Sequence, residues 1–220
     1  MKLRKITSIV ICSSILLGLT GCDALKNMSA KNKKMAKVLE TLEDMGFKEY
    51  EKKKDIKTGV FESTKEPDRI EEFFDCYEFP AADEDDITRL TFGQRLEESD
   101  LGDDYDNQFV GIYVEFADED DAEDYYDDLV DFYEGVYDRY SSLSDDSIEI
   151  GYDENKGTMI IAFDIDDYSA ELSVRAGAVL DDNGVYFVLS IGYEDSAEEY
   201  ADLADDFFDG LKLDEPSSCL

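Results

Sequence analysis

Residues 109–140 read FVGIYVEFADEDDAEDYYDDLVDFYEGVYDRY, and this stretch decides the fold class of the chain. Over residues 109–116, apolar side chains fill every second position, which is typical of a strand with one buried face. Over residues 122–140, apolar side chains recur at intervals of three and four, which predicts an amphipathic helix. Asp120 and Glu123 have the spacing of a capping box at the start of this helix. The stretch therefore predicts a strand that leads directly into a long helix.

The C-terminal part of the chain continues this alternation of strands and helices. Four more strands are expected, over residues 148–152, 159–165, 172–180 and 185–193. Asn155-Lys156-Gly157 and Asp182-Asn183-Gly184 supply the turns, and the second is a strong hairpin signal. A last amphipathic helix is predicted over residues 197–211.

The N-terminal part is harder to interpret. Apolar residues at helical spacing predict a helix over residues 35–45, and residues 48–65 are expected to hold one or two short strands. A second helix is expected to open at Glu66-Pro67-Asp68 and to end before Pro80. Residues 81–107 give the weakest pattern, and acidic loops are expected there around residues 87–96.

The strand–helix unit occurs twice. Val110 aligns with Val185 and Asp120 aligns with Asp195, so the offset is 75 positions in both cases (185 − 110 and 195 − 120). Two related lobes, over residues 35–140 and 141–214, are expected from this repeat. The alternative is that two unrelated segments share one helix cap and one apolar period. The sequence thus predicts an α+β fold, with antiparallel sheet and amphipathic helices packed on one face, in two partly repeated strand–helix lobes.

The chain begins with a basic and then apolar leader. Lys2, Arg4 and Lys5 precede an apolar run over residues 6–19, which is the layout of a secretory signal peptide. This run is shorter than the ~20 apolar residues that a membrane-spanning helix needs.

The residues that follow the apolar run, Leu19-Thr20-Gly21-Cys22, resemble the lipobox of bacterial lipoproteins. The resemblance implies that the Cys22 thiol receives a diacylglyceryl group and that Cys22 becomes the mature N-terminus. Gly21 is then the last residue that the signal peptidase removes. Two acyl chains anchor a protein stably to a membrane. The alternatives are an ordinary signal peptide that ends in Gly-Cys and an N-terminal signal anchor.

Four segments follow from this interpretation. Residues 1–21 are expected to be the signal peptide, residues 22–34 a lipidated N-terminus and basic tether, residues 35–214 an acidic α+β body, and residues 215–220 a flexible tail. The order of motifs along the body resembles poorly characterised lipoproteins of low-GC Gram-positive bacteria. That resemblance implies no activity and no site residues.

The charge is divided unevenly along the chain. From residue 23 to residue 69 there are 12 Lys and Arg against 10 Asp and Glu, a balance of +2, whereas residues 70–220 hold 6 against 47, a balance of −41. The acidic part would be repelled by phosphate, which excludes nucleic acid as a partner. Hydrophobic residues make up 43% of the chain, so the acidic body is still expected to fold. The simpler explanation of the acidity is solubility without any specific partner.

Two cysteines remain once Cys12 is removed with the leader and Cys22 carries lipid. Cys76 and Cys219 are the pair available for a disulfide in an exported protein, where it would close a long loop. The alternative is that Cys76 is a buried free thiol and that Cys219 lies in a mobile tail.

Catalytic chemistry is restricted by the absence of histidine from the chain. Ser-His and Cys-His nucleophiles, imidazole bases and His-bound zinc are thereby excluded. Hydrolysis of cell-wall glycans by two carboxylates stays open as a weaker alternative, and no catalytic residue is assigned. A response to Ca²⁺ or Mg²⁺ is another alternative, because the acidic runs 83–86, 103–106 and 164–167 offer oxygen ligands. None of these runs has the calcium-loop pattern, so no metal ligand is assigned.

The leading hypothesis is a membrane-anchored extracytoplasmic binding module. The membrane would be contacted through the N-terminal lipid, and the partner would be a basic protein or a cationic ligand that the acidic surface attracts. No cofactor is expected.

Overall fold

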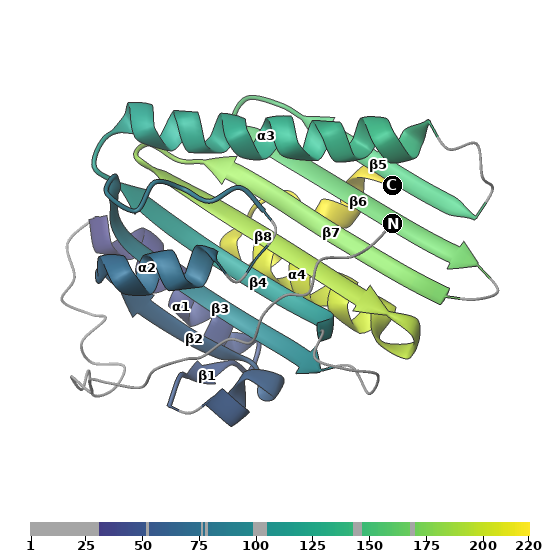
Figure 1. The fold of residues 1–220 in the computed structure, drawn as a ribbon, viewed down its shortest axis with the longest axis horizontal. Coiled ribbons are helices and arrows are strands. Elements are labelled where there is room, and N and C mark those ends of the chain that lie inside the picture. Colours follow the sequence, from purple (N-terminus) through teal and green to yellow (C-terminus); the bar gives the residue numbers. More distant parts are fainter. Residues whose placement is uncertain are drawn as a thin grey trace.

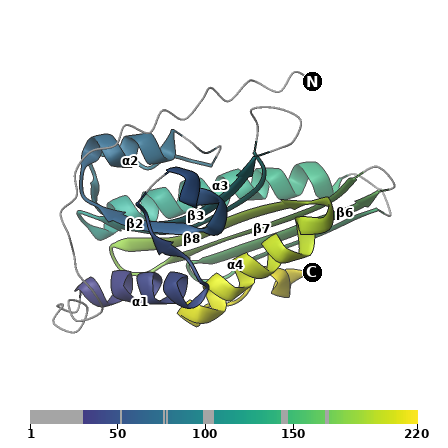
Figure 2. The ribbon, with the colours of Figure 1, turned by 90° about the horizontal axis from the view of Figure 1, so that it is seen from below.

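The computed structural model describes residues 31–51, 53–75, 77, 79–98, 105–142, 147–167 and 170–220. In these residues a single eight-stranded sheet lies between helices on both of its faces (Figures 1 and 2). The α+β class and the antiparallel sheet agree with the sequence-based prediction.

The strands follow the order β1-β2-β3-β4-β8-β7-β6-β5 across the sheet. Their bounds are β1 Lys48–Glu49, β2 Val60–Thr64, β3 Ile87–Glu98, β4 Tyr105–Phe116, β5 Ile148–Glu154, β6 Thr158–Asp167, β7 Ala170–Leu180 and β8 Gly184–Tyr193. β1 pairs with β2 in parallel, and every other neighbouring pair is antiparallel.

Four α-helices and three short 3₁₀ turns accompany the sheet in the described residues. They are α1 Lys31–Asp44, η2 Lys53–Thr58, α2 Pro67–Phe74, α3 Glu119–Ser141, η3 Glu194–Ser196, α4 Ala197–Leu211 and η4 Pro216–Cys219. The bounds of α4 are those predicted from the sequence. α3 begins slightly earlier than its capping-box spacing predicts, because the Asp118 side chain accepts the hydrogen bond from the Asp121 N–H at 3.2 Å.

The helices cover both faces of the sheet rather than the one face that was predicted. α2 and α3 pack on one face, and α1 and α4 pack on the other (Figure 2). The reason lies in β8, where residues 184–190 are all buried. Phe187 points to the α3 face and Val188 points to the α4 face, so an apolar surface must be covered on each side.

The two repeated strands lie side by side in the centre of the sheet. β4 pairs antiparallel with β8, and Ile112 lies opposite Phe187, the residue with which the repeat aligns it. The predicted lobes therefore contribute β1–β4 and β5–β8 to one continuous sheet. The helices that follow the two repeated strands lie on opposite faces of the sheet. The chain also enters them differently: α3 follows β4 without an intervening 3₁₀ turn, whereas Glu194 adopts a positive φ of 50° and begins η3 before α4.

The prediction of acidic loops around residues 87–96 is wrong. Residues 87–98 form β3, a long strand between β2 and β4. Leu90, Phe92 and Leu96 are buried at alternate positions, and the intervening Thr91 is buried as well. The charged and polar residues between them concealed this period from the sequence analysis.

Candidate interaction surface

The outward face of α3 is acidic along its whole length. With 23 residues, α3 is about 34 Å long. Its exposed acidic side chains beyond the first turn are Glu123, Asp124, Asp127, Asp128, Asp131, Glu134 and Asp138. Arg139 is the single basic residue of this helix. The helix therefore presents a nearly uniform negative surface on the side away from the sheet.

β5 forms the edge of the sheet that lies beside α3. The rings of Tyr137 in α3 and Tyr152 in β5 are 5.5 Å apart, and Figure 1 shows the two elements side by side at the same border of the molecule. Burial, together with the negative charges of Glu154, Glu134 and Asp131, raises the pKa of Tyr152 to about 12. These carboxylates thus lie close to the edge strand.

Six exposed carboxylates lie along this edge of the sheet, and we call them the β5 border. They are Asp127, Asp131 and Glu134 of α3 and Glu149, Asp153 and Glu154 of β5. β5 itself contains no basic residue. The border therefore combines an edge strand with a strongly negative local field.

The C-terminal residues lie under β5 on the face opposite α3. Residues 215–220 were expected to be a flexible tail, whereas the structure places them in and around η4, packed against β5, β6 and β7. Pro216 is buried, and the backbone of Cys219 lies against Gly151 of β5. Leu220 remains 43% exposed at this position.

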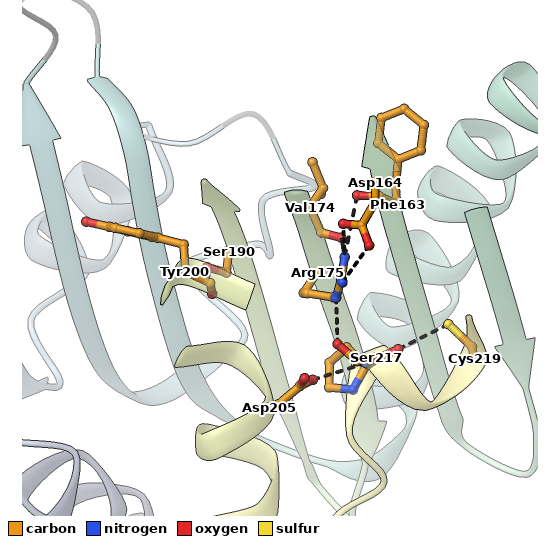
Figure 3. Close-up of polar contacts among 10 residues, drawn as sticks. Phe163, Asp164, Val174, Arg175, Ser190, Tyr200, Asp205, Ser217 and Cys219 are labelled. Atoms are coloured by element: carbon orange, nitrogen blue, oxygen red, sulfur yellow. Dashed lines mark hydrogen bonds and ion pairs between the residues drawn. The ribbon is translucent and has the colours of Figure 1, made fainter. Parts of the chain in front are cut away.

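A buried arginine holds this tail in place (Figure 3). Arg175 of β7 is only 6% exposed, and its guanidinium donates to both Asp164 oxygens, at 2.7 and 2.9 Å. Its Nε donates to the Ser217 hydroxyl at 2.6 Å. The Ser217 N–H in turn donates to Asp205 of α4 at 3.0 Å. This network links β6, β7, α4 and the tail, and its groups satisfy one another, which is typical of a structural role.

Most of the residues that the sequence predicts for lipid attachment, cleavage or a disulfide lie outside the described residues. These are Gly21, Cys22 and Cys76. The Cys219 thiol is free and donates to the Pro216 carbonyl at 3.1 Å, and burial raises its pKa. Because Cys76 lies outside the described residues, the Cys76–Cys219 disulfide stays a prediction.

Two carboxylates of the acidic runs considered for cations have partners within the protein. Asp83 accepts a hydrogen bond from the Asp85 N–H at 3.0 Å, and Asp164 pairs with Arg175. Asp103 and Asp104 lie outside the described residues. Within the described part of the chain, no group of three or more acidic or cysteine side chains is arranged to hold a metal ion.

Two basic residues of α1, Lys34 and Lys37, contact the body. Lys34 was expected in the tether, but it lies in α1 and pairs with Asp181 at 2.9 Å and Asp182 at 3.0 Å. Lys37 donates to the Leu211 carbonyl, at the C-terminal end of α4. A cation at this end of a helix is favourable because it meets the negative end of the helix dipole. α1 is thereby fixed to the α4 face.

The acidity of this surface follows from the sequence, but the two features that shape the surface do not. The edge position of β5 depends on the order of all eight strands, and no local pattern encodes that order. The tail can dock only because residue 151 is a glycine. The sequence signal that could have indicated this contact is a glycine inside a predicted strand, since such a glycine often marks a close approach of another backbone.

None of the helices in the described ranges has the length and apolar character required to cross a membrane.

Comparison with known proteins gives little guidance. No protein-family model matches the sequence, and a search of curated proteins finds no match. Among solved structures, the extracellular domain of PknH from Mycobacterium tuberculosis is similar, with a TM-score of 0.33 and 13% sequence identity. The match covers 57% of this chain and 65% of that chain, which is less than two thirds of its length. At this TM-score the likeness supports no conclusion about fold or function.

Proposed function

We propose that the protein is a lipid-anchored extracytoplasmic binding module whose acidic β5 border holds a basic partner. The observation that carries the proposal is the border itself, where six exposed carboxylates accompany an edge strand. An arrangement of this kind attracts cationic partners and speeds their association.

The anchor supports the same proposal. The sequence places a lipobox cysteine at position 22, and α1 begins at Lys31, so eight residues lie between them and nine Cα–Cα steps (31 − 22) join them. A chain of that length spans at most about 30 Å. Because Lys34 and Lys37 fix α1 to the body, the body would stay within that distance of the membrane surface and act on partners at the envelope.

Lipid attachment is tested by growing cells that express the protein with an alkyne-bearing fatty acid. Wild-type protein should take up the label, and intact-mass analysis should show a mature N-terminus at a diacylated Cys22. Cys22→Ala should lose both signals and retain its leader. An unprocessed leader or a fatty-acid-free terminus in the wild-type protein would remove the anchor from the proposal.

The partner is tested by affinity capture from envelope extract at low ionic strength. Basic proteins should be retained and then released by about 0.5 M salt, where the screening length falls to a few ångström. Neutralising the six border carboxylates as amides should abolish this capture. If no protein is released by salt, the proposed binding function fails.

A further inference from the structure

We infer that the basic partner binds as an added strand on β5, so that an extended Lys- or Arg-containing segment of another protein continues the sheet. This inference rests on the proposed function and names the mode of binding and the chemistry of the occupant. Edge strands with open backbone groups are known templates for such addition.

The backbone of β5 offers the necessary hydrogen-bonding groups. The Asp166 N–H donates to the Ser147 carbonyl at 2.9 Å, and the Asn155 N–H donates to the Thr158 carbonyl at 2.8 Å. Odd-numbered residues of this strand therefore bond to β6, and the alternate ones point away from it. The outward groups belong to Ile148, Ile150, Tyr152 and Glu154. No strand in the described part of the chain pairs with this side of β5.

The opposite edge of the sheet is not an equivalent site. β1 has only two residues, and its backbone is joined to β2 through Lys48 and Tyr50. An added segment gains few ladder hydrogen bonds from so short a strand. The seven residues of β5 make it the longer of the two edges.

Side chains on both faces of β5 provide places for an alternating segment. On the α3 face, Ile150 and Tyr152 are half-buried, and Tyr152 contacts Tyr137. On the other face, Gly151 is backed by the tail, where Leu220 is exposed. Alternate side chains of an added strand would therefore meet an aromatic surface on one face and the tail on the other.

The negative charge of the β5 border determines which kind of segment can add to β5. Glu149, Asp153 and Glu154 are exposed on β5. Glu154 lies on the same face as the acids of α3, whereas Glu149 and Asp153 lie on the face of the tail, so both faces of the edge are negative. A second copy of this chain would bring the same carboxylates against them, which is unfavourable between paired strands. An extended segment with Lys or Arg at alternate positions neutralises them instead.

The test uses a defined probe, a fluorescent nonapeptide of alternating Lys and Thr, and the mature chain with Cys22→Ser to keep it free of lipid. A second peptide of the same sequence carries N-methyl groups on alternate residues, so that it keeps its charge but cannot form the ladder. The unmodified peptide should bind at least about tenfold more tightly than the methylated one, since each lost hydrogen bond weakens binding.

Hydrogen exchange locates the contact on the chain. The N–H groups of Ile150 and Tyr152 should exchange about tenfold more slowly when the unmodified peptide is bound. The Gly151 N–H, which faces β6, should not change.

Matched variants separate the border from the general acidity. The border variant should bind the unmodified peptide about tenfold more weakly, as expected for the loss of three exposed charge pairs. It combines Glu149→Gln, Asp153→Asn and Glu154→Gln. The control variant removes the same charge from the exposed face of α4 and should change binding less than about twofold. It combines Glu198→Gln, Asp202→Asn and Asp209→Asn.

The outcomes distinguish this inference from the proposed function. Equal binding of the two peptides, with loss in the border variant alone, would overturn strand addition and leave an electrostatic border in place. Binding of neither peptide, or equal loss in both variants, would also overturn it. Failure of the proposed function shows separately, as the absence of salt-released partners in the envelope capture.

Discussion

The carbonyl of Cys219 lies against Gly151, at the position that a side chain on residue 151 would occupy. The two residues are 68 positions apart (219 − 151), and their contact joins the C-terminus to the edge strand. Even one methyl group there would overlap backbone atoms, which cannot rotate away as a flexible side chain can.

Gly151→Ala is therefore expected to displace the tail from β5. The Cys219 thiol, half-buried in the wild-type protein, should then react faster with a thiol reagent. The measurement uses the mature chain with Cys22→Ser and Cys76→Ser, in which Cys219 is the only thiol that remains.

The control for this variant is Gly135→Ala in α3, where a Cβ would meet nothing within 4 Å. It should leave thiol reactivity unchanged and raise the free energy of unfolding by about 0.5–1 kcal/mol, because alanine is the better helix former. Unchanged thiol reactivity in Gly151→Ala would show that the tail does not depend on this contact.

Arg175→Ala should destabilise the protein more than most single substitutions. It leaves the Asp164 carboxylate without its partner and removes the bond to Ser217, and breaking a buried pair costs about 3 kcal/mol or more. Asp164 is about a third exposed, which places the expected loss of unfolding free energy at the lower end of that range. Urea denaturation measures it.

A double-mutant cycle of Arg175→Ala with Asp164→Ala isolates the interaction free energy between the two side chains. Arg175→Lys retains the charge but not the two-oxygen geometry, so it should fall between wild type and Arg175→Ala. Additive effects of the two alanine substitutions would show that the pair contributes nothing beyond its separate members.

Much of the fold could be predicted because its elements have strong local periods. The last helix, over residues 197–211, has the predicted bounds, and the four strands before it were each located. β3 was missed because its polar residues make remote contacts that the sequence does not reveal: Gln94 accepts from Tyr77 at 2.7 Å, and Arg95 pairs with Glu199 at 2.7 Å. Satisfied in this way, polar side chains become compatible with a central strand.

The candidate surface was predictable only in its charge. The exposed carboxylates of α3 follow from the helical period, and the composition predicts an acidic exterior. The open side of β5 follows from the strand order. β8 pairs with β4, and β7 and β6 follow it, so β5 lies at the edge of the sheet. Such long-range order is set by packing of the whole sheet, as is the contact between Gly151 and Cys219.

Phe187→Ala tests the core beneath α3. The side chain is fully buried between Phe79, 4.8 Å away, and Tyr133, 6.0 Å away between ring centres. Its removal should lower the free energy of unfolding by about 3–5 kcal/mol. Phe132→Ala is the control, because Phe132 is 41% exposed and its ring makes an edge-to-face contact with Tyr133 at 5.0 Å, so its loss should cost about 1 kcal/mol. Similar losses in the two variants would contradict the placement of α3.

Asp206 of α4 should make stability depend on pH in the direction opposite to most carboxylates. Partial burial, and then the charges of Asp202, Asp205 and Asp209, raise the pKa of Asp206 above 3.8. The folded state therefore binds this proton more tightly than the unfolded chain does. The contribution of Asp206 to stability is fully present below the unfolded pKa and is lost as the pH rises through the folded pKa.

Asp206→Asn is consequently expected to raise the free energy of unfolding at neutral pH by a few tenths of a kcal/mol, because the site is exposed and screened by solvent. The gain should vanish near pH 3, where the carboxyl is protonated in both states, and should shrink in high salt. Urea denaturation at the two pH values measures it, with Asp214→Asn as a control that removes one charge outside the α4 cluster. A gain that persists undiminished at low pH would mean that the carboxylate charge is not its cause.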